Sequence, residues 1–158
     1  MPTVTFSATG TGTGVRQDLD VVGSGHVIRS DAYESFGGKD EFPSPLAYAL
    51  ASLTTCNQVT ASIVAKEQGF EIRSYAFSVD GDFNPTVMTT GRQADDDHPD
   101  TFTAVRLSAQ VDTDASPEQV EALGAEVERR CPVSALYRRA GTALSSTWTV
   151  RTAATTAS

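Results

Sequence analysis

The residues of this chain best suited to covalent chemistry are its two cysteines, Cys56 and Cys131. A cysteine thiolate can attack a peroxide, become a sulfenic acid and then condense with a second thiol to form a disulfide. The two positions are far apart in the sequence, so only the fold can bring them together. Cysteine is also among the residues most often buried as a small apolar side chain, so packing alone is the alternative interpretation of both.

The segment around Cys56 predicts a long, buried helix. Residues 47–64 carry no charge, and their apolar side chains recur at spacings of three and four. Pro45 in the first turn and Gly69 after the last turn bracket this helix. Such a helix is buried on most of its sides, as at a subunit interface. Its predicted apolar stripe consists of Leu46, Ala49, Leu50, Leu53, Cys56, Thr60, Ile63 and Val64.

Cys131 stands before a proline, at the expected start of a short helix over residues 133–140. Unpaired backbone N–H groups at a helix start favour an anion and lower the pKa of a cysteine there. A second helix should precede it, because Ser116, Pro117 and Gln119 form a capping box with proline in the first turn. Its expected apolar face consists of Val120, Leu123 and Val127.

The remaining segments predict strands, and the whole pattern predicts an α+β fold. Three short strands separated by glycine-rich turns predict an antiparallel meander at residues 4–8, 15–22 and 26–30, with a turn through Gly10, Gly12 and Gly14. Later strands are expected at residues 72–79, 102–111 and 146–151. The acidic stretch 84–100 is expected to be an exposed loop, and residues 151–158 a flexible tail.

Length and charge limit the class of protein. A chain of 158 residues fits one domain, and we expect a single domain over residues 1–158. A formal net charge of −8 opposes binding to nucleic acid or to an anionic membrane. No apolar run is long enough to cross a bilayer, and the N-terminus lacks the pattern of a signal peptide. These features predict a cytoplasmic protein, in which a disulfide is transient and catalytic rather than structural.

Two motifs resemble the OsmC/Ohr family. The first is Gly37-Gly38, then Pro43-Ser44-Pro45-Leu46 and a helix that reaches Cys56; the second is Cys131-Pro132-Val133-Ser134. The order of the segments also matches, from the N-terminal meander to a last strand containing Trp148-Thr149-Val150. The resemblance covers nearly the whole chain, from Val4 to Val150, and the two motifs in this order are more specific than either one.

This resemblance implies an intertwined homodimer in which antiparallel sheets wrap around long central helices. It also implies a thiol-dependent peroxidase that reduces organic hydroperoxides or hydrogen peroxide without a metal or bound organic cofactor. By position, Cys56 would be the peroxidatic residue and Cys131 the resolving residue. The implied partners are a second copy of the chain, the peroxide substrate and an external dithiol reductant that reopens the disulfide by exchange.

The family also supplies an arginine from the N-terminal meander to stabilise the thiolate. Arg16 is the first candidate by position and Arg29 the second, while a solvated strand arginine is the ordinary interpretation of either. In the family, a glutamate at the start of the proline-flanked helix holds this arginine. Here that position is Leu46-Ala47, so Glu34 or Glu41 would have to replace it. The departure favours a divergent OsmC-like branch over the Ohr branch.

A non-enzymatic role is the competing hypothesis. The missing glutamate and the uncharged helix also fit an OsmC-like dimer that binds a small hydrophobic ligand, with the cysteines as packing residues. The pKa of Cys56 distinguishes the two: a value near or above the ordinary thiol value of about 8.5 favours the binder, and a value well below it favours the enzyme.

Overall fold

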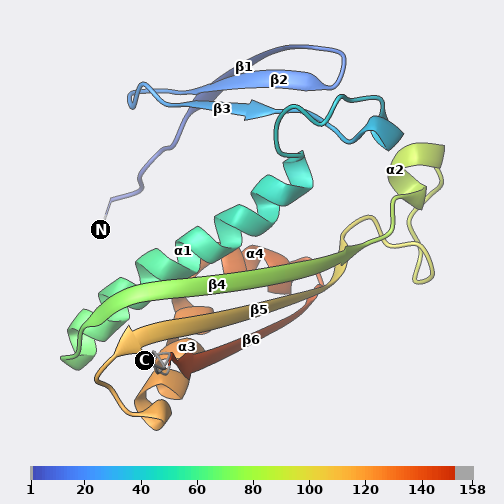
Figure 1. Cartoon of the computed structure of the whole chain (residues 1–158). Coiled ribbons are helices and arrows are strands. Elements are labelled where there is room, and N and C mark those ends of the chain that lie inside the picture. The colour runs from blue at the N-terminus through green and yellow to red at the C-terminus, as the bar shows by residue number, and fades with distance from the viewer. Residues whose placement is uncertain (1, 152–158) are drawn as a thin grey trace, which may run out of the picture. The chain divides into compact units, whose positions relative to one another are not determined.

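The N-terminal sheet begins later than its sequence predicts. The computed structural model describes residues 2–151, and its contacts group the chain into two compact units, Met1–Ala49 and Leu50–Ser158. In the first unit, β1 (Ala8–Thr13), β2 (Arg16–Val21) and β3 (Val27–Ser30) form an antiparallel sheet in the order β1-β2-β3 (Figure 1). The predicted meander is therefore confirmed, whereas the single domain stays a prediction.

The position predicted for the first strand was wrong, because the Gly-Thr segment expected to be a turn is itself β1. Only Gly14 has the positive φ of a tight turn, at 64°. Gly12 is extended, and a side chain there would collide with the backbone carbonyl of Arg16 on the paired strand. These glycines thus serve the close approach of two strands as well as the turn between them.

The segment between β3 and the long helix is organised by one buried carboxylate. Asp31 accepts hydrogen bonds from the backbone N–H groups of Ala32 at 2.8 Å, Lys39 at 3.1 Å and Glu41 at 3.1 Å. The Ala32 bond is the main reason that the pKa of Asp31 lies below its ordinary value. A short 3₁₀ turn, η1 (Glu34–Phe36), lies inside this loop. The Asp31 carboxylate therefore joins both ends of this loop, together with backbone hydrogen bonds such as Asp40 N–H to the Ala32 carbonyl at 3.1 Å.

The long helix α1 (Pro45–Gln68) has the predicted bounds. Ser44 begins it, accepting a hydrogen bond from the Ala47 N–H at 3.2 Å, and Gly69 follows with φ 80°. The predicted stripe is partly wrong, because Ile63 is exposed and Asn57 is buried. The buried face consists of Leu53, Asn57, Thr60, Ala61, Val64 and Ala65.

The second sheet belongs to the unit that begins at Leu50. Its strands β4 (Ile72–Phe83), β5 (Phe102–Thr113) and β6 (Ala143–Val150) have the order β4-β5-β6. β4 and β5 are antiparallel, but β6 runs parallel to β5. This sheet is therefore mixed, which corrects the expectation of purely antiparallel sheets. The parallel pairing is possible because two helices connect β5 to β6.

The stretch between β4 and β5 was predicted to be an exposed loop. This prediction was partly wrong, because the stretch contains a short helix, α2 (Thr86–Thr90). Asn84 Oδ1 accepts a hydrogen bond from the Thr86 N–H at 3.0 Å, and Gly91 ends the helix with φ 69°. Further along, Asp95 pairs with Arg92 at 2.7 Å and with His98 at 3.0 Å. Asp95 of the acidic run thus has one ion pair, with Arg92, and a side-chain contact with His98.

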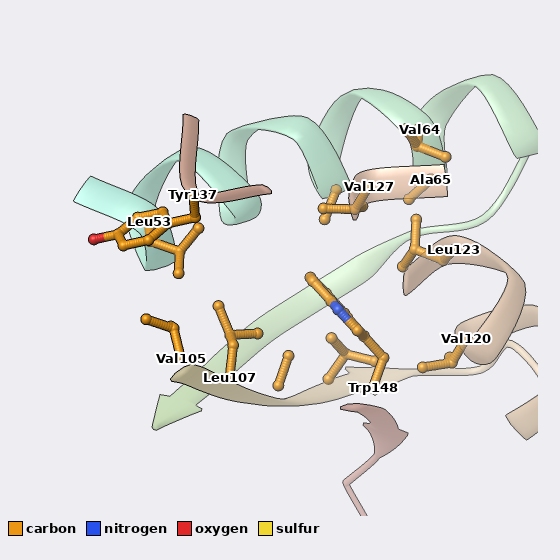
Figure 2. Packing of buried hydrophobic residues seen from close by; sticks show 13 residues of the cluster. Leu53, Val64, Ala65, Val105, Leu107, Val120, Leu123, Val127, Tyr137 and Trp148 are labelled. Atoms are coloured by element: carbon orange, nitrogen blue, oxygen red, sulfur yellow. The ribbon is translucent and has the colours of Figure 1, made fainter. Parts of the chain in front are cut away.

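The helices α3 (Pro117–Arg130) and α4 (Pro132–Arg139) complete the second unit. The predicted capping box of Ser116 and Gln119 is present. Figure 2 shows Trp148 of β6 lying against Leu123 and Val127 of α3. The core of this unit fills one face of the sheet and consists of Leu53, Ala61, Val64, Ala65, Val105, Leu107, Ala109, Val111, Val120, Leu123, Val127, Tyr137 and Trp148. Within residues 2–151, no helix has the length and apolar character needed to span a bilayer.

Candidate active site

The fold brings the two cysteines together. Cys56 lies in the middle of α1, and Cys131 is the residue between α3 and α4, acting as the N-cap of α4. Their thiol groups lie close enough for each to shift the pKa of the other, and neither is in a disulfide. Cys131 is fully buried, whereas Cys56 is half-buried. Two residues remote in sequence therefore form one thiol pair.

The position of Cys131 follows from the proline after it. Proline restricts the preceding residue to extended geometry, and Cys131 has φ −67° and ψ 119°. Pro132 occupies the first position of α4, where its missing N–H costs no hydrogen bond. The Sγ atom of Cys131 can then accept a hydrogen bond from the Ser134 N–H at 3.5 Å. The Cys-Pro motif thus places a sulfur at the N-terminus of a helix.

A buried amide that the sequence did not single out supports this sulfur. Asn57 is 2% exposed, and its Nδ2 lies 3.5 Å from Cys131 Sγ and 3.1 Å from Ser134 Oγ. The same nitrogen donates to the Leu53 carbonyl at 2.9 Å. The only signal in the sequence was its spacing, since Leu53, Asn57 and Ala61 are each one turn apart on α1.

The two thiols have opposite electrostatic environments. Burial raises the pKa of Cys56, and its hydrogen bond with Cys131 raises that pKa further. Burial acts in the same direction on Cys131, but hydrogen bonds from the Ser134 N–H, the Ser134 hydroxyl and Cys56 lower the pKa of Cys131 below its ordinary value. Within the pair, these shifts favour the thiolate on Cys131 over the thiolate on Cys56.

The candidate arginines lie in the first unit, where an acidic residue holds each of them. Arg16 donates to Glu41 Oε2 at 2.7 Å, and its guanidinium lies 4.7 Å from the centre of the Phe42 ring. Arg29 is 3.5 Å from Asp18 Oδ2. Of the two glutamates considered as replacements for the missing family glutamate, Glu41 is the one that contacts Arg16, while Glu34 lies in η1.

These features define an α+β protein in which two free cysteines meet at the N-terminus of a helix. A family model described as OsmC-like protein matches residues 38–146, and the chain belongs to this family. No curated protein matches the sequence. Family membership confirms the resemblance that the two cysteine motifs carried.

Solved structures share the fold at low sequence identity. An OsmC-like protein from Mycoplasma pneumoniae superposes with a TM-score of 0.77 at 16% identity, covering 94% of this chain and 99% of its own. An organic hydroperoxide resistance protein from Elizabethkingia anophelis, with thiocyanate bound, gives 0.74 at 16% identity, covering 95% and 99%. One from Legionella pneumophila gives 0.70 at 17% identity, covering 96% and 100%. The predicted α+β, OsmC-like fold is confirmed.

Proposed function

We propose that this protein is a thiol-dependent peroxidase that reduces organic hydroperoxides or hydrogen peroxide. The observation that carries the proposal is the contact between the Cys56 and Cys131 thiols. Family membership and neighbours named organic hydroperoxide resistance proteins support it. A packing role explains one buried and one half-buried cysteine, but it does not require the N–H donors beside the Cys131 sulfur.

The proposed reaction uses Cys56 as the nucleophile, because it is the less buried thiol. Its thiolate attacks one peroxide oxygen, the O–O bond breaks, and Cys56 becomes a sulfenic acid while an alcohol or water leaves. Cys131 then attacks the Cys56 sulfur, which forms the disulfide and releases water. An external dithiol restores both thiols by exchange. The proposal places these steps in the cytoplasm, where thiol reductants are abundant.

The raised pKa of Cys56 is the direction that the ligand-binding alternative predicts. The peroxidase proposal therefore requires a cation beside the Cys56 thiolate, and we assign this role to Arg16, with Arg29 as the second candidate. The ion pair between Arg16 and Glu41 supports the choice, because it fixes the guanidinium as the missing family glutamate would. Arg16→Ala should slow the formation of the sulfenic acid, and Glu41→Gln should have the same effect to a smaller degree.

We further propose that the protein is a homodimer. On α1, Val59 is 62% exposed and Ile63 is 48% exposed, one turn apart on the otherwise uncharged stretch that carries Cys56. Exposed apolar neighbours of this kind mark an interaction surface. Ile63→Glu should shift the mass measured by light scattering from dimer to monomer. A monomeric wild-type protein at micromolar concentration contradicts this part of the proposal.

The central test is peroxide consumption with a dithiol reductant present. Cys56→Ser should abolish it, and Cys131→Ser should stop at a sulfenic acid that a dimedone probe labels. Ser62→Ala, on the exposed side of the same helix, is the matched control and should keep full activity. If one equivalent of cumene hydroperoxide forms no intramolecular disulfide in the wild-type protein, the peroxidase proposal fails.

A further inference from the structure

The two sulfurs of the thiol pair differ in how a molecule from solvent can reach them. Cys131 has no exposed surface, whereas Cys56 is half-buried on α1. Thiol–disulfide exchange requires the attacking sulfur to approach one sulfur of the disulfide directly. Access therefore favours attack on Cys56.

The two sulfurs also differ in the hydrogen-bond donors that would stabilise a negative charge on them. The Ser134 N–H and the Asn57 side-chain amide each lie 3.5 Å from Cys131 Sγ. The Val133 N–H is directed at both sulfurs, so it does not discriminate between them. The hydroxyl of Thr60 also lies near Cys56, but its single hydrogen is donated to the Cys56 carbonyl at 2.9 Å, so it contributes little to the sulfur. Stabilisation by hydrogen bonds therefore favours Cys131 as the thiolate.

The side chain of Asn57 is fixed in an orientation that directs its amide nitrogen toward Cys131 Sγ. Its Nδ2 is anchored by the Leu53 carbonyl at 2.9 Å and by Ser134 Oγ at 3.1 Å, and the residue is 2% exposed. A side chain held this firmly loses little conformational freedom when the sulfur beside it becomes charged. Because the amide has two N–H groups for three acceptors, one of them is shared with Cys131 Sγ, which is the most distant acceptor.

We propose that the disulfide of this protein is reduced in one fixed direction, by attack of the external thiol on Cys56, with Cys131 as the leaving thiolate and Asn57 as the positioning residue that holds it. The inference rests on the proposed disulfide but not on the identity of the oxidant. An external thiolate sulfur bonds to Cys56 Sγ, the bond between Cys56 and Cys131 breaks, and its electron pair stays on Cys131. A second external thiol then displaces Cys56, which takes up a proton, and the reductant leaves as a disulfide.

The chemistry of leaving groups supports this direction. A thiol with a lower pKa leaves faster, and the hydrogen bonds around Cys131 lower its pKa while burial raises that of Cys56. Access and charge stabilisation therefore act together, so the opposite direction is disfavoured twice. A reductant that matches the site has to reach only the sulfur on α1.

The direct test uses wild-type protein oxidised with diamide, which forms the disulfide without any peroxidase activity. A large excess of 2-mercaptoethanol is added, and samples are quenched with acid at early times, alkylated and analysed as peptides by mass spectrometry. The expected product carries mercaptoethanol on Cys56 and the alkyl group on Cys131. Mercaptoethanol on Cys131, or equally on both, overturns the proposal.

The role of Asn57 is tested by Asn57→Leu, which keeps a similar volume and removes the amide donors. The disulfide of this variant should be reduced about three- to tenfold more slowly, because its leaving group is poorer. In a Cys56→Ser background the same substitution should raise the measured pKa of Cys131. Ser62→Ala is the control for both measurements. An unchanged rate in a folded Asn57→Leu protein overturns the assignment of Asn57.

The outcomes separate this inference from the proposed function. Normal disulfide formation with diamide but no consumption of peroxide removes only the peroxidase proposal. Peroxidase activity with mercaptoethanol captured on Cys131 removes only the direction of reduction. If neither diamide nor peroxide forms the disulfide, both proposals fail.

Discussion

The two three-stranded sheets of this protein are stabilised in different ways. The sheet of β4, β5 and β6 packs one face against helices, and Val105, Ala109 and Val111 of β5 have no exposed surface. In the sheet of β1, β2 and β3, no strand residue is buried, and every residue of β1 is exposed. The sheet of β4, β5 and β6 therefore gains stability from buried apolar area, whereas the sheet of β1, β2 and β3 has no such buried face in the single chain.

This difference between the two sheets indicates that the sheet of β1, β2 and β3 needs another surface to pack against. A small sheet is independently stable when it has a hydrophobic face that packs on something. Val27 and Ile28 of β3 are 47% and 40% exposed, although both are strong strand formers. Exposed apolar strand residues on an unburied sheet are what the proposed homodimer would cover. The following predictions test the contrast between the two sheets.

The largest effect is expected at the centre of the buried sheet. Trp148 is 6% exposed and packs edge-on against Phe77, with ring centres 5.7 Å apart. Trp148→Ala should lower the free energy of unfolding by about 3–5 kcal/mol, because it leaves a cavity beneath α3. Urea denaturation measures this, with Thr147→Ala on the exposed face of the same strand as the control. A loss below 1 kcal/mol would contradict the assignment of the core.

A smaller loss is expected from filling the space that Trp148 requires. A Cβ atom on Gly124 of α3 would collide with the indole, so only glycine fits there. Alanine is favoured over glycine within a helix by about 1 kcal/mol. Gly124→Ala should nevertheless destabilise the protein by about 1–3 kcal/mol, because overpacking outweighs this preference. Thermal unfolding checks the sign, and Ala125→Gly, at the exposed neighbour, reports the helix preference alone.

The first unit should respond to pH through Asp31. The pKa of this carboxyl is lowered in the folded protein, mainly by the Ala32 N–H, so its contribution is present above the unfolded value near 3.8. The contribution is lost as the pH falls through the lower, folded pKa. The amide resonances of Ala32, Lys39 and Glu41 should therefore titrate together in acid, as measured by NMR.

Asp31→Asn should remove this titration and speed hydrogen exchange of the same three amides several-fold, because an amide accepts hydrogen bonds less strongly than a carboxylate. Asp40→Asn, in the same loop, is the control, and asparagine tolerates its positive φ of 55°. If both variants behave alike, the loop is not organised by Asp31. A loosened loop should also weaken the pairing of Glu41 with Arg16.

The sequence predicted the elements whose signals are local. The ends of α1, the capping box of α3 and the N-cap position of Cys131 are all set by proline, serine, glycine and glutamine within one turn. The start of β1 was missed because its glycines serve a close approach between strands, which depends on the partner strand. The parallel pairing of β6 was missed because alternation along a strand carries no direction.

The two cysteines of the candidate site could be singled out from the sequence, whereas the groups around them could not. Cys56 and Cys131 were identified by residue type and by family motifs. Asn57 was not, because an uncharged polar residue on an apolar helix gives no signal until Cys131 and Ser134 are placed against it. The exposure of Ile63 was missed for a related reason. The spacing of apolar residues on α1 predicts a broad apolar face, but it does not show which side of that face the rest of the chain covers.

The smallest effect is expected on the unburied sheet. Ile28→Thr keeps a β-branched residue on β3 and removes apolar surface that is already partly exposed. In a monomer it should change the free energy of unfolding by less than about 0.5 kcal/mol. Val111→Thr, the matched change on buried β5, should cost about 1–3 kcal/mol, because it places a hydroxyl in the core. The loss of unfolding free energy caused by Ile28→Thr is then compared at several protein concentrations. If it rises with concentration toward the loss caused by Val111→Thr, a second copy covers the sheet of β1, β2 and β3. The contrast between the two sheets is then a property of the single chain alone.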